Sequence, residues 1–361
     1  MGSDIHGRRL TAALAAAMLL VLGAGAPLAA DQAVERLPRL AVDPAGITVS
    51  GISAGGYMAL HFHVAHAALV SGAAVIAAGP YHCAGDGYPR NLHRALNVCT
   101  NYLEWVPFFG PPDIGRSLAE TRKQAEAGAI DDPAHLGDDR VFLFSGTFDR
   151  KVPSAVVTAA GEYYRTWLDA DRIRLVDSVP VGHAMATDGF GNVCTTSEHP
   201  WVNDCGYDTA GELLDHLYPP LADPVVADGT LLAFDQTEFA EDVREASLNR
   251  VGFAYVPNAC AEGATCRLHI AFHGCQQYHD NIGDAFYRGA GYNGWAEANG
   301  IIVLYPQAAP LERSILGISL KWPNPLGCFD WWGFTGPDVH LQSGAQIRAV
   351  KAMVDRLAGW D

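Results

Sequence analysis

GISAG, residues 51–55, has the pattern G-x-S-x-G, in which a serine stands between two glycines. The β-branched run GITVS precedes the serine turn at residues 46–50, and the apolar stretch 57–70 follows it. A strand, a tight glycine turn and a helix in this order are the context of a nucleophile elbow. We therefore predict that Ser53 projects its hydroxyl from the end of a buried strand as a nucleophile. The alternative is a glycine-rich turn with an incidental serine.

A serine nucleophile needs a base, and the base needs an orienting carboxylate. On an elbow scaffold these groups follow in the chain order Ser, Asp or Glu, His, each after a strand. The predicted strand 141–145 leads to Asp149, and the predicted strand 173–179 leads to His183. We predict that Asp149 orients the base and that His183 is the base. The alternatives are a turn aspartate that caps the helix from Ser154 and a loop histidine.

Apolar runs bounded by Gly and Pro also predict strands at residues 251–256, 268–272 and 301–305. Such runs are typical of strands that are covered on both faces. Helical periodicity is clearest at residues 154–168, 211–217 and 343–357. The alternation predicts a single-domain α/β fold with a mostly parallel sheet and helices on both faces. The proline-rich stretch 218–224 (YPPLADP) resembles a linker but does not obviously separate two domains.

The oxyanion of acyl transfer needs two N–H donors, and their order in this chain is unusual. One donor is the N–H of Ala54, and the other normally lies in an HG-type loop that precedes the nucleophile. Here the HG sequence comes late, at His273-Gly274-Cys275. The segment 343–360 is interpreted as the amphipathic helix that normally leads into the elbow strand, but here it ends the chain. We therefore predict a circularly permuted α/β-hydrolase whose ends lie close together, with the join near residues 218–224.

Charge and the first 30 residues limit the function classes. The chain has 361 residues and a formal net charge of −16, which argues against binding to a phosphate backbone. Residues 1–30 combine Arg8 and Arg9, an apolar run and small residues, and this pattern predicts a cleavable signal peptide. No other stretch has 18 consecutive apolar residues, so we expect no membrane span. Residues 31–361 are then the catalytic domain of a secreted or periplasmic protein.

Eight cysteines, an even number in an exported chain, predict four disulfides, although the sequence alone allows about 105 pairings. Proximity in the sequence suggests Cys83–Cys99, Cys194–Cys205 and Cys260–Cys266, which leaves Cys275–Cys328. No paired C-x-x-C ligands are present, so we expect no metal site. The histidines at positions 61, 63 and 66 look somewhat like a metal cluster, but no carboxylate stands near His63 or His66 in the sequence. They are predicted to be structural or surface groups.

Five motifs in this order resemble the poly(3-hydroxybutyrate) depolymerase family: GISAGGYMA, FDRKVP, VGHAM, FHGCQQ and CFDWWG. The order is similar to that of the permuted single-domain members and the type 2 catalytic domain, and the resemblance covers nearly all of residues 40–361. It implies a triad of Ser53, Asp149 and His183, with the N–H groups of Ala54 and Cys275 as the oxyanion hole. It also implies a Cys275–Cys328 bridge and a substrate site at Trp332, Trp331 and His273. Ordinary core packing is the alternative for the two tryptophans.

The resemblance implies two-step ester hydrolysis of a polyhydroxybutyrate chain or its oligomers, without a cofactor, and the sequence indicates no protein partner. Many secreted relatives add a polymer-binding domain, whereas this sequence stops at Asp361, which favours amorphous polymer or soluble oligomers as the expected substrate. Two rival interpretations remain. One is a feruloyl or acetylxylan esterase, and the other is a non-catalytic polyester-binding protein with the same fold.

Overall fold

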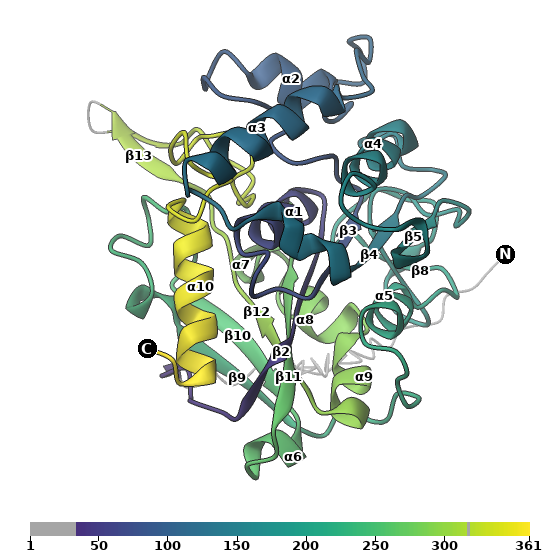
Figure 1. The fold of residues 1–361 in the computed structure, drawn as a ribbon, viewed down its shortest axis with the longest axis vertical. Coiled ribbons are helices and arrows are strands. Elements are labelled where there is room, and N and C mark those ends of the chain that lie inside the picture. Colours follow the sequence, from purple (N-terminus) through teal and green to yellow (C-terminus); the bar gives the residue numbers. More distant parts are fainter. Residues whose placement is uncertain (1–33, 316–317) are drawn as a thin grey trace, which may run out of the picture. The chain divides into compact units, whose positions relative to one another are not determined.

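A nine-stranded sheet forms the centre of the computed structural model, which describes residues 34–315 and 318–361 (Figure 1). Six of its eight strand pairings are parallel, and the exceptions are the two that β10 makes with β9 and β12. The prediction of a mostly parallel sheet is therefore confirmed. In spatial order the strands are β1 (Val34–Glu35), β9 (Thr230–Asp235), β10 (Val251–Val256), β12 (Ile301–Tyr305), β11 (Cys266–Phe272), β2 (Val42–Ile52), β3 (Gly72–Ile76), β4 (Arg140–Phe144) and β5 (Ile173–Val176).

Helices cover both faces of this sheet. The longer ones are α1 (Ala54–Ala65), α3 (Ile114–Glu126), α4 (Ser154–Tyr164), α5 (Thr209–Leu217), α9 (Tyr292–Asn299) and α10 (Ala345–Ala358). The shorter ones are α2 (Leu92–Asn97), α6 (Asn258–Ala261), α7 (His279–Ile282) and α8 (Ala285–Gly289). No helix among the described residues has both the length and the apolar character that a membrane crossing requires.

The central strand β2 shows how the two faces differ. Thr48 and Ser50 point to one face, where they hydrogen-bond to the hydroxyls of Tyr218, just after α5, and Tyr292 in α9. Gly51 points to the opposite face, against the first turn of α1. Successive residues of a strand alternate between faces, and here both faces are covered. That is why the second half of β2 is fully buried and reads as an unbroken run rather than an alternating pattern.

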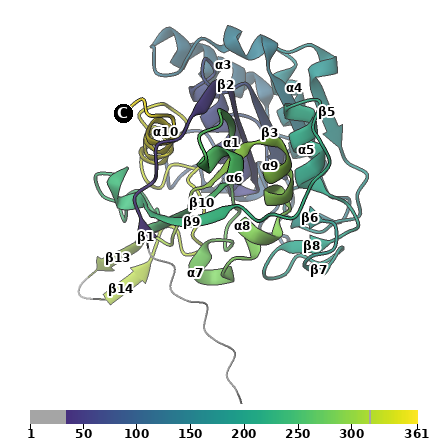
Figure 2. The ribbon, with the colours of Figure 1, turned by 90° about the horizontal axis from the view of Figure 1, so that it is seen from below.

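Three structures lie outside the main sheet. Residues 77–139, between β3 and β4, carry α2 and α3, which lie at the top of Figure 1. A small parallel sheet contains β6 (Met185–Thr187), β8 (Val202–Asp204) and β7 (Asn192–Val193). A hairpin of β13 (Glu312–Ile315) and β14 (Ile318–Lys321) lies at the edge of the view in Figure 2, far from the small sheet.

The predicted elements are present with shifted ends. The strand expected at 46–50 is part of the longer β2, and the strand expected at 173–179 ends at Val176. The helix expected at 154–168 ends at Tyr164 as α4. The linker-like residues 218–224 follow α5 directly and lead towards β9. The signal peptide expected at residues 1–30 lies outside the described residues.

Four disulfides cross-link the described part of the chain. They join the same pairs that were considered in the sequence: Cys83–Cys99, Cys194–Cys205, Cys260–Cys266 and Cys275–Cys328. Three of them close short segments, whereas the fourth spans 53 positions. This long bridge ties the loop after β11 to the loop that follows the hairpin, so it acts at the carboxyl end of the sheet.

Candidate active site

Ser53 lies in the turn between β2 and α1, in a backbone conformation that residues with a side chain rarely adopt. Its φ is 57° and its ψ is −122°. Such a conformation costs roughly 1–3 kcal/mol, so the surrounding structure must impose it. A Cβ on Gly51 would lie 2.1 Å from the carbonyl oxygen of Gly55, and one on Gly55 would lie 2.3 Å from that of Phe272. The two flanking glycines of the motif are therefore required by close backbone approach.

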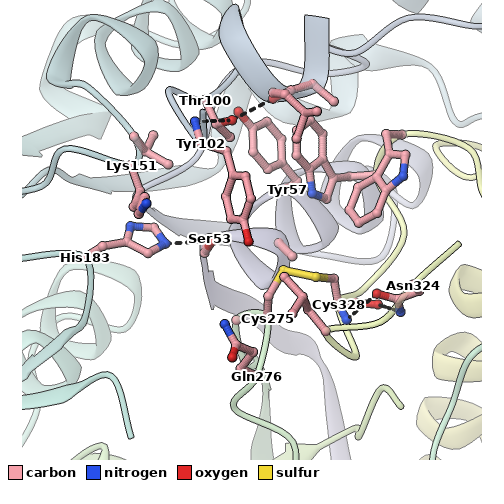
Figure 3. Close-up of a pocket in the computed structure, with 18 of the residues that line it drawn as sticks. Ser53, Tyr57, Thr100, Tyr102, Lys151, His183, Cys275, Gln276, Asn324 and Cys328 are labelled. Atoms are coloured by element: carbon pink, nitrogen blue, oxygen red, sulfur yellow. Dashed lines mark hydrogen bonds between the residues drawn. A yellow bond between two sulfur atoms is a disulfide. The ribbon is translucent and has the colours of Figure 1, made fainter. Parts of the chain in front are cut away.

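Three side chains from three loops form a continuous hydrogen-bonded chain. His183 Nε2 lies 2.9 Å from Ser53 Oγ (Figure 3), and His183 Nδ1 lies 2.8 Å from Asp149 Oδ2. The loops follow β2, β4 and β5, parallel strands of the same sheet (β3 lies between β2 and β4) whose carboxyl ends lie along one edge. The structure thus brings together Ser53, Asp149 and His183, the three residues that were predicted from their order in the chain.

Asp149 is fixed by its own turn. Its Oδ1 accepts hydrogen bonds from the backbone N–H groups of Lys151, at 2.8 Å, and Val152, at 2.9 Å. The Asp149 side chain is 1% exposed, so water does not compete for these contacts. Helix α4 begins after Pro153 without a side-chain cap, and Asp149 therefore does not cap it. The second carboxylate oxygen is left to orient the imidazole.

Two backbone N–H groups beside the serine have no acceptor within residues 34–315 and 318–361. The Ala54 N–H belongs to the first turn of α1, where helical N–H groups have no intrahelical partner. The Cys275 N–H makes no backbone hydrogen bond among the described residues. Its loop lies close to the nucleophile, because a Cβ on Gly274 would come within 3.3 Å of Ser53 Cβ. The Cys275–Cys328 bridge holds this loop opposite His183 (Figure 3).

His273 does not reach the substrate cavity, and its expected role in substrate binding is therefore wrong. Its ring is fully buried, Nδ1 lies 2.7 Å from the Gly274 carbonyl, and Nε2 accepts the N–H of Ala308 at 3.0 Å. Burial lowers its pKa to about 4, so the ring stays neutral at neutral pH. Through these contacts His273 holds the backbone of the loop that contains the Cys275 N–H, here called the donor loop.

A largely apolar cavity of about 340 Å³ opens directly above Ser53. Its lining includes the nucleophile, the base and both donor residues. The remaining wall is mostly aromatic and aliphatic, from elements far apart in the sequence: Ile52, Tyr57, Leu92, Ala95, Leu96, Tyr102, Val152, Trp201, Trp322, Pro323, Pro325, Leu326, Trp331 and Trp332. Such a cavity favours an uncharged organic chain over a charged substrate.

Trp331 and Trp332, the two tryptophans of the CFDWWG motif, both line this cavity. Trp331 stacks on Tyr57, with ring centroids 4.0 Å apart. Tyr57 in turn donates its hydroxyl hydrogen bond to the carbonyl of Cys99. Burial raises the pKa of Tyr57 well above its usual range, and the phenol therefore stays neutral. Trp332 packs edge to face against Trp331 and continues the same wall.

Asp330 holds the segment 331–335, which contains both tryptophans, in place. Its buried carboxylate accepts hydrogen bonds from the backbone N–H groups of Trp332, Gly333 and Thr335 and from the Thr335 hydroxyl. Burial raises the pKa of Asp330 to about 6, although these hydrogen bonds counteract the shift. The segment is thus built around one carboxylate that the sequence did not single out.

Sequence reasoning also missed Tyr57, Tyr102 and Lys151 as cavity residues. Lys151 forms an ion pair with Glu104 at 2.7 Å and lies over the Tyr102 ring. Its place in the FDRKVP motif, two positions after Asp149, was the available signal. Tyr57 gave no comparable signal, because it is one of many apolar residues in the predicted helix.

His61, His63 and His66 are all buried, and one reason given against a metal site at these histidines was wrong. His63 does have a carboxylate partner, since its Nε2 lies 3.0 Å from Asp139 Oδ2. Its Nδ1 lies 2.9 Å from the Tyr164 hydroxyl, so both ring nitrogens are used. Asp139 is far away in the sequence and could not be recognised there. Burial also lowers the pKa of His66 to about 4.

Comparisons with known proteins agree with this geometry. The chain is 36% identical to a poly(3-hydroxybutyrate) depolymerase of Delftia acidovorans, over 97% of this chain and 66% of the relative. It is 33% identical to a polyhydroxybutyrate depolymerase of Talaromyces funiculosus, over 94% of this chain and 96% of the relative. It thus spans slightly less than two thirds of the first relative and nearly all of the second. A search of models of known protein families finds no match.

Two solved structures are similar over 90% of this chain and 99% of theirs, each with a TM-score of 0.78 and 30% sequence identity. One is a PHB depolymerase from Penicillium funiculosum. The other is a serine-to-alanine variant of a PHB depolymerase in complex with an R3HB trimer. Sequence identity over almost the whole of one relative and a shared fold lead to the same conclusion. The chain belongs to the poly(3-hydroxybutyrate) depolymerase family of α/β-hydrolases.

Proposed function

We propose that this protein hydrolyses the ester bonds of poly(3-hydroxybutyrate) or its oligomers. The observation that carries the proposal is the Ser53–His183–Asp149 hydrogen-bonded chain at the floor of an apolar, aromatic-walled cavity. A chain of 3-hydroxybutyrate units is uncharged and carries methyl groups, so it suits such walls. The bound R3HB trimer of the similar structure supports the same substrate class.

In the first step, His183 accepts the Ser53 proton at Nε2 as the hydroxyl oxygen attacks the ester carbonyl carbon. The tetrahedral oxyanion receives hydrogen bonds from the N–H groups of Ala54 and Cys275. Asp149 holds the imidazole orientation and stabilises the imidazolium. The C–O bond of the ester then breaks, and His183 returns its proton to the departing alkoxide. A hydroxyl-ended fragment leaves and an acyl-serine remains.

In the second step, water replaces the alcohol. His183 removes a proton from the water molecule, and the resulting hydroxide attacks the acyl-serine carbonyl while the same N–H groups stabilise the oxyanion. Collapse of this intermediate breaks the bond to Ser53 Oγ, which takes the proton back from His183. The product is a carboxylate-ended 3-hydroxybutyrate oligomer or monomer. The reaction needs only water as co-substrate.

A serine-directed phosphonate and a substrate panel test the proposal. The wild-type protein is expected to add one phosphonate per chain, and Ser53→Ala is expected to add none. Hydrolysis of a hydroxybutyrate trimer should exceed that of feruloyl and acetylated sugar esters by at least tenfold in kcat/KM. Equal or higher rates on the sugar esters would identify a different carboxylesterase, and absence of labelling would identify a non-catalytic protein.

We further propose that residues 1–30 are a signal peptide and that residues 31–361 form one catalytic domain that acts outside the cytoplasm. Four disulfides support an oxidising compartment, because such bonds persist there. N-terminal sequencing of the protein released from expressing cells tests this assignment. A mature protein that still begins at residue 1 would contradict it.

The strand order supports a circular permutation of the hydrolase fold. The donor-loop strand β11 pairs directly with the nucleophile strand β2 but follows it in the chain. In the usual arrangement the donor-loop strand comes first. The Leu40 N–H donates a 2.7 Å hydrogen bond to the Leu357 carbonyl, and Arg39 forms an ion pair with Asp361. The start of β2 thus lies beside the end of α10, where an unpermuted chain would continue directly.

A further inference from the structure

A group of metal-ligand side chains lies outside the catalytic cavity. His82, Glu120 and His340 each offer a ligand atom, and these atoms lie within 4.8 Å of one another. The residues come from the loop after β3, from helix α3 and from the loop before α10. None of them lines the cavity above Ser53, so ester hydrolysis does not account for their convergence.

His82 has a hydrogen-bond pattern that is common among metal-binding histidines. Its Nε2 lies 3.1 Å from Asp86 Oδ1, and its Nδ1 has no hydrogen-bond partner within the described ranges. A ligating histidine typically donates its second ring N–H to a carboxylate, which fixes the ring and frees the other nitrogen for the metal. Asp86 supplies that carboxylate, and Nδ1 is the free nitrogen.

His340 is buried but poorly satisfied. Its side chain is 1% exposed. Among the described residues the ring makes one hydrogen bond, a long 3.4 Å contact from Nε2 to Glu120 Oε1, and its Nδ1 has no partner there. Its ring stacks on that of His82 at 4.0 Å. Buried polar atoms without partners are costly, so their persistence calls for a physical reason.

We propose that His82, Glu120 and His340 bind one divalent transition-metal ion such as Zn²⁺, with water as a fourth ligand. Two imidazoles and one carboxylate are a common zinc ligand set, and three protein ligands leave a position for water. Asp86 and Glu120 bring two carboxylates to the group, opposed by the ammonium group of Lys123 at 3.1 Å from Glu120. A divalent cation therefore gains a favourable local field.

Binding requires only a small adjustment. Tetrahedral zinc with bonds of about 2.1 Å holds its ligand atoms about 3.4 Å apart, so the present atoms, which lie within 4.8 Å of one another, must approach by at most about 1.4 Å. The parallel stacking of the two rings means that one ring must also turn. His82 can turn because it lines an open cavity of about 260 Å³, together with Asp86 and Trp332. Lys123 is 63% exposed and can release Glu120.

The metal would brace one wall of the catalytic cavity. His82 directly precedes Cys83, whose disulfide to Cys99 closes the segment that carries Leu92 and Leu96 into the cavity lining. Asn91 of this segment donates a 2.8 Å hydrogen bond to the Trp332 carbonyl. A metal that links His82 to α3 and to the loop before α10 would therefore restrict the motion of this cavity wall.

Calorimetry on untagged, chelator-stripped mature protein tests the site, with zinc chloride as the probe. We expect one zinc per chain and a melting temperature about 4 °C higher at a zinc concentration one hundred times Kd. His82→Ala and Glu120→Gln should each weaken zinc binding about 100-fold or more, since loss even of an outer partner weakens metal binding 10–100-fold. His135→Ala is the matched control, because His135 is exposed and lies outside the group.

The wild-type titration alone can overturn the proposal. Absence of stoichiometric binding, or of a thermal shift, would do so even if a variant failed to fold. Unchanged zinc affinity in a folded His82→Ala or Glu120→Gln protein would also exclude this site. Since the readouts are zinc binding and melting, they do not depend on ester hydrolysis or on the substrate proposed above.

Discussion

Ser53 shows how a single residue can trade stability for function. Its left-handed backbone places the hydroxyl against His183, and the contacts of the flanking strand and helix impose that conformation. A serine in this conformation is less stable than a glycine would be, because only glycine has no Cβ to clash. The strain therefore marks the position as functional independently of the sequence motif.

Substitution of Ser53 should separate these two effects. Ser53→Gly and Ser53→Ala should both lose activity by about 10⁴-fold or more, because each lacks the nucleophile. Ser53→Gly should be more stable than Ser53→Ala by about 1 kcal/mol, because only glycine relieves the strained φ of 57°. Chemical denaturation of the two inactive proteins measures the difference. Equal stabilities would show that the turn is not strained.

Asp149 should matter through orientation rather than through substrate binding. Asp149→Asn keeps the shape of the side chain but replaces the carboxylate by an amide. An amide N–H facing His183 Nδ1 favours the tautomer with the proton on Nε2, which cannot accept the Ser53 proton. We expect kcat to fall about 10⁴-fold with little change in KM. Steady-state kinetics on a soluble hydroxybutyrate oligomer measure this. Asp188→Asn, at an exposed position, is the control and should keep wild-type kinetics, whereas full activity of Asp149→Asn would remove this residue from the triad.

At the scale of elements, the sequence was most informative where local chemistry dictates local structure. The elbow between β2 and α1 could be predicted from the sequence. Close backbone contacts there exclude any residue with a Cβ, so the required glycines form a recognisable motif. Strand β3, with the sequence GAAVI, was missed because small residues carry little strand signal. The stacking of Tyr57 on Trp331 could not be predicted, since it joins residues that only the folded chain brings together. His273 was misassigned because a motif does not show which way a side chain points.

The segment built on Asp330 should respond to pH. Burial raises the pKa of Asp330 to about 6 in the folded protein, from about 3.9 in an unfolded chain. Between these values the folded state binds more protons, so the contribution of this group to stability falls as the pH rises through the window. Relative to Asp330→Asn, which does not titrate, the wild type should lose about 2 kcal/mol between pH 4.5 and pH 7.5.

Urea denaturation of both proteins across this pH range gives the comparison, and tryptophan fluorescence reports on Trp331 and Trp332 in the same samples. A difference between the two unfolding free energies that stays constant with pH would show that Asp330 does not titrate in this window. Asp242→Asn provides a control carboxylate in a surface turn and should give no comparable pH dependence.

At the scale of the molecule, the long disulfide connects the donor loop to the rest of the fold. Replacing Cys275 and Cys328 together by alanine keeps the backbone N–H at position 275 but removes the covalent link that holds the donor loop. We expect a stability loss of up to about 4 kcal/mol, from the 53-position separation, and a lower kcat/KM. The pair Cys260–Cys266 is the control: its removal should cost about 2 kcal/mol and leave kcat/KM unchanged. Equal kinetic losses in both double variants would argue against a special role for the long bridge.

The proposed permutation makes the connectivity of the whole molecule testable. A chain that starts at Pro224, runs to Asp361, continues through a flexible linker of about twelve Gly and Ser residues to Ala33 and ends at Asp223 would restore the usual strand order. The new ends lie in an exposed stretch between α5 and β9, where new termini are best tolerated. The hydrogen bond from Leu40 to Leu357 shows that β2 and α10 already meet near the new join.

This rearranged protein should fold and keep kcat/KM on hydroxybutyrate oligomers within about tenfold of the wild type, because the contacts around Ser53 do not depend on which loop carries the chain ends. A second rearrangement, opened between Ile270 and Ala271 inside the buried strand β11, is the matched control and should not fold. Circular dichroism and oligomer hydrolysis compare the two. If the first protein failed to fold while the wild type refolded under the same conditions, the present chain order would be a requirement of this fold and not a rearrangement that it tolerates.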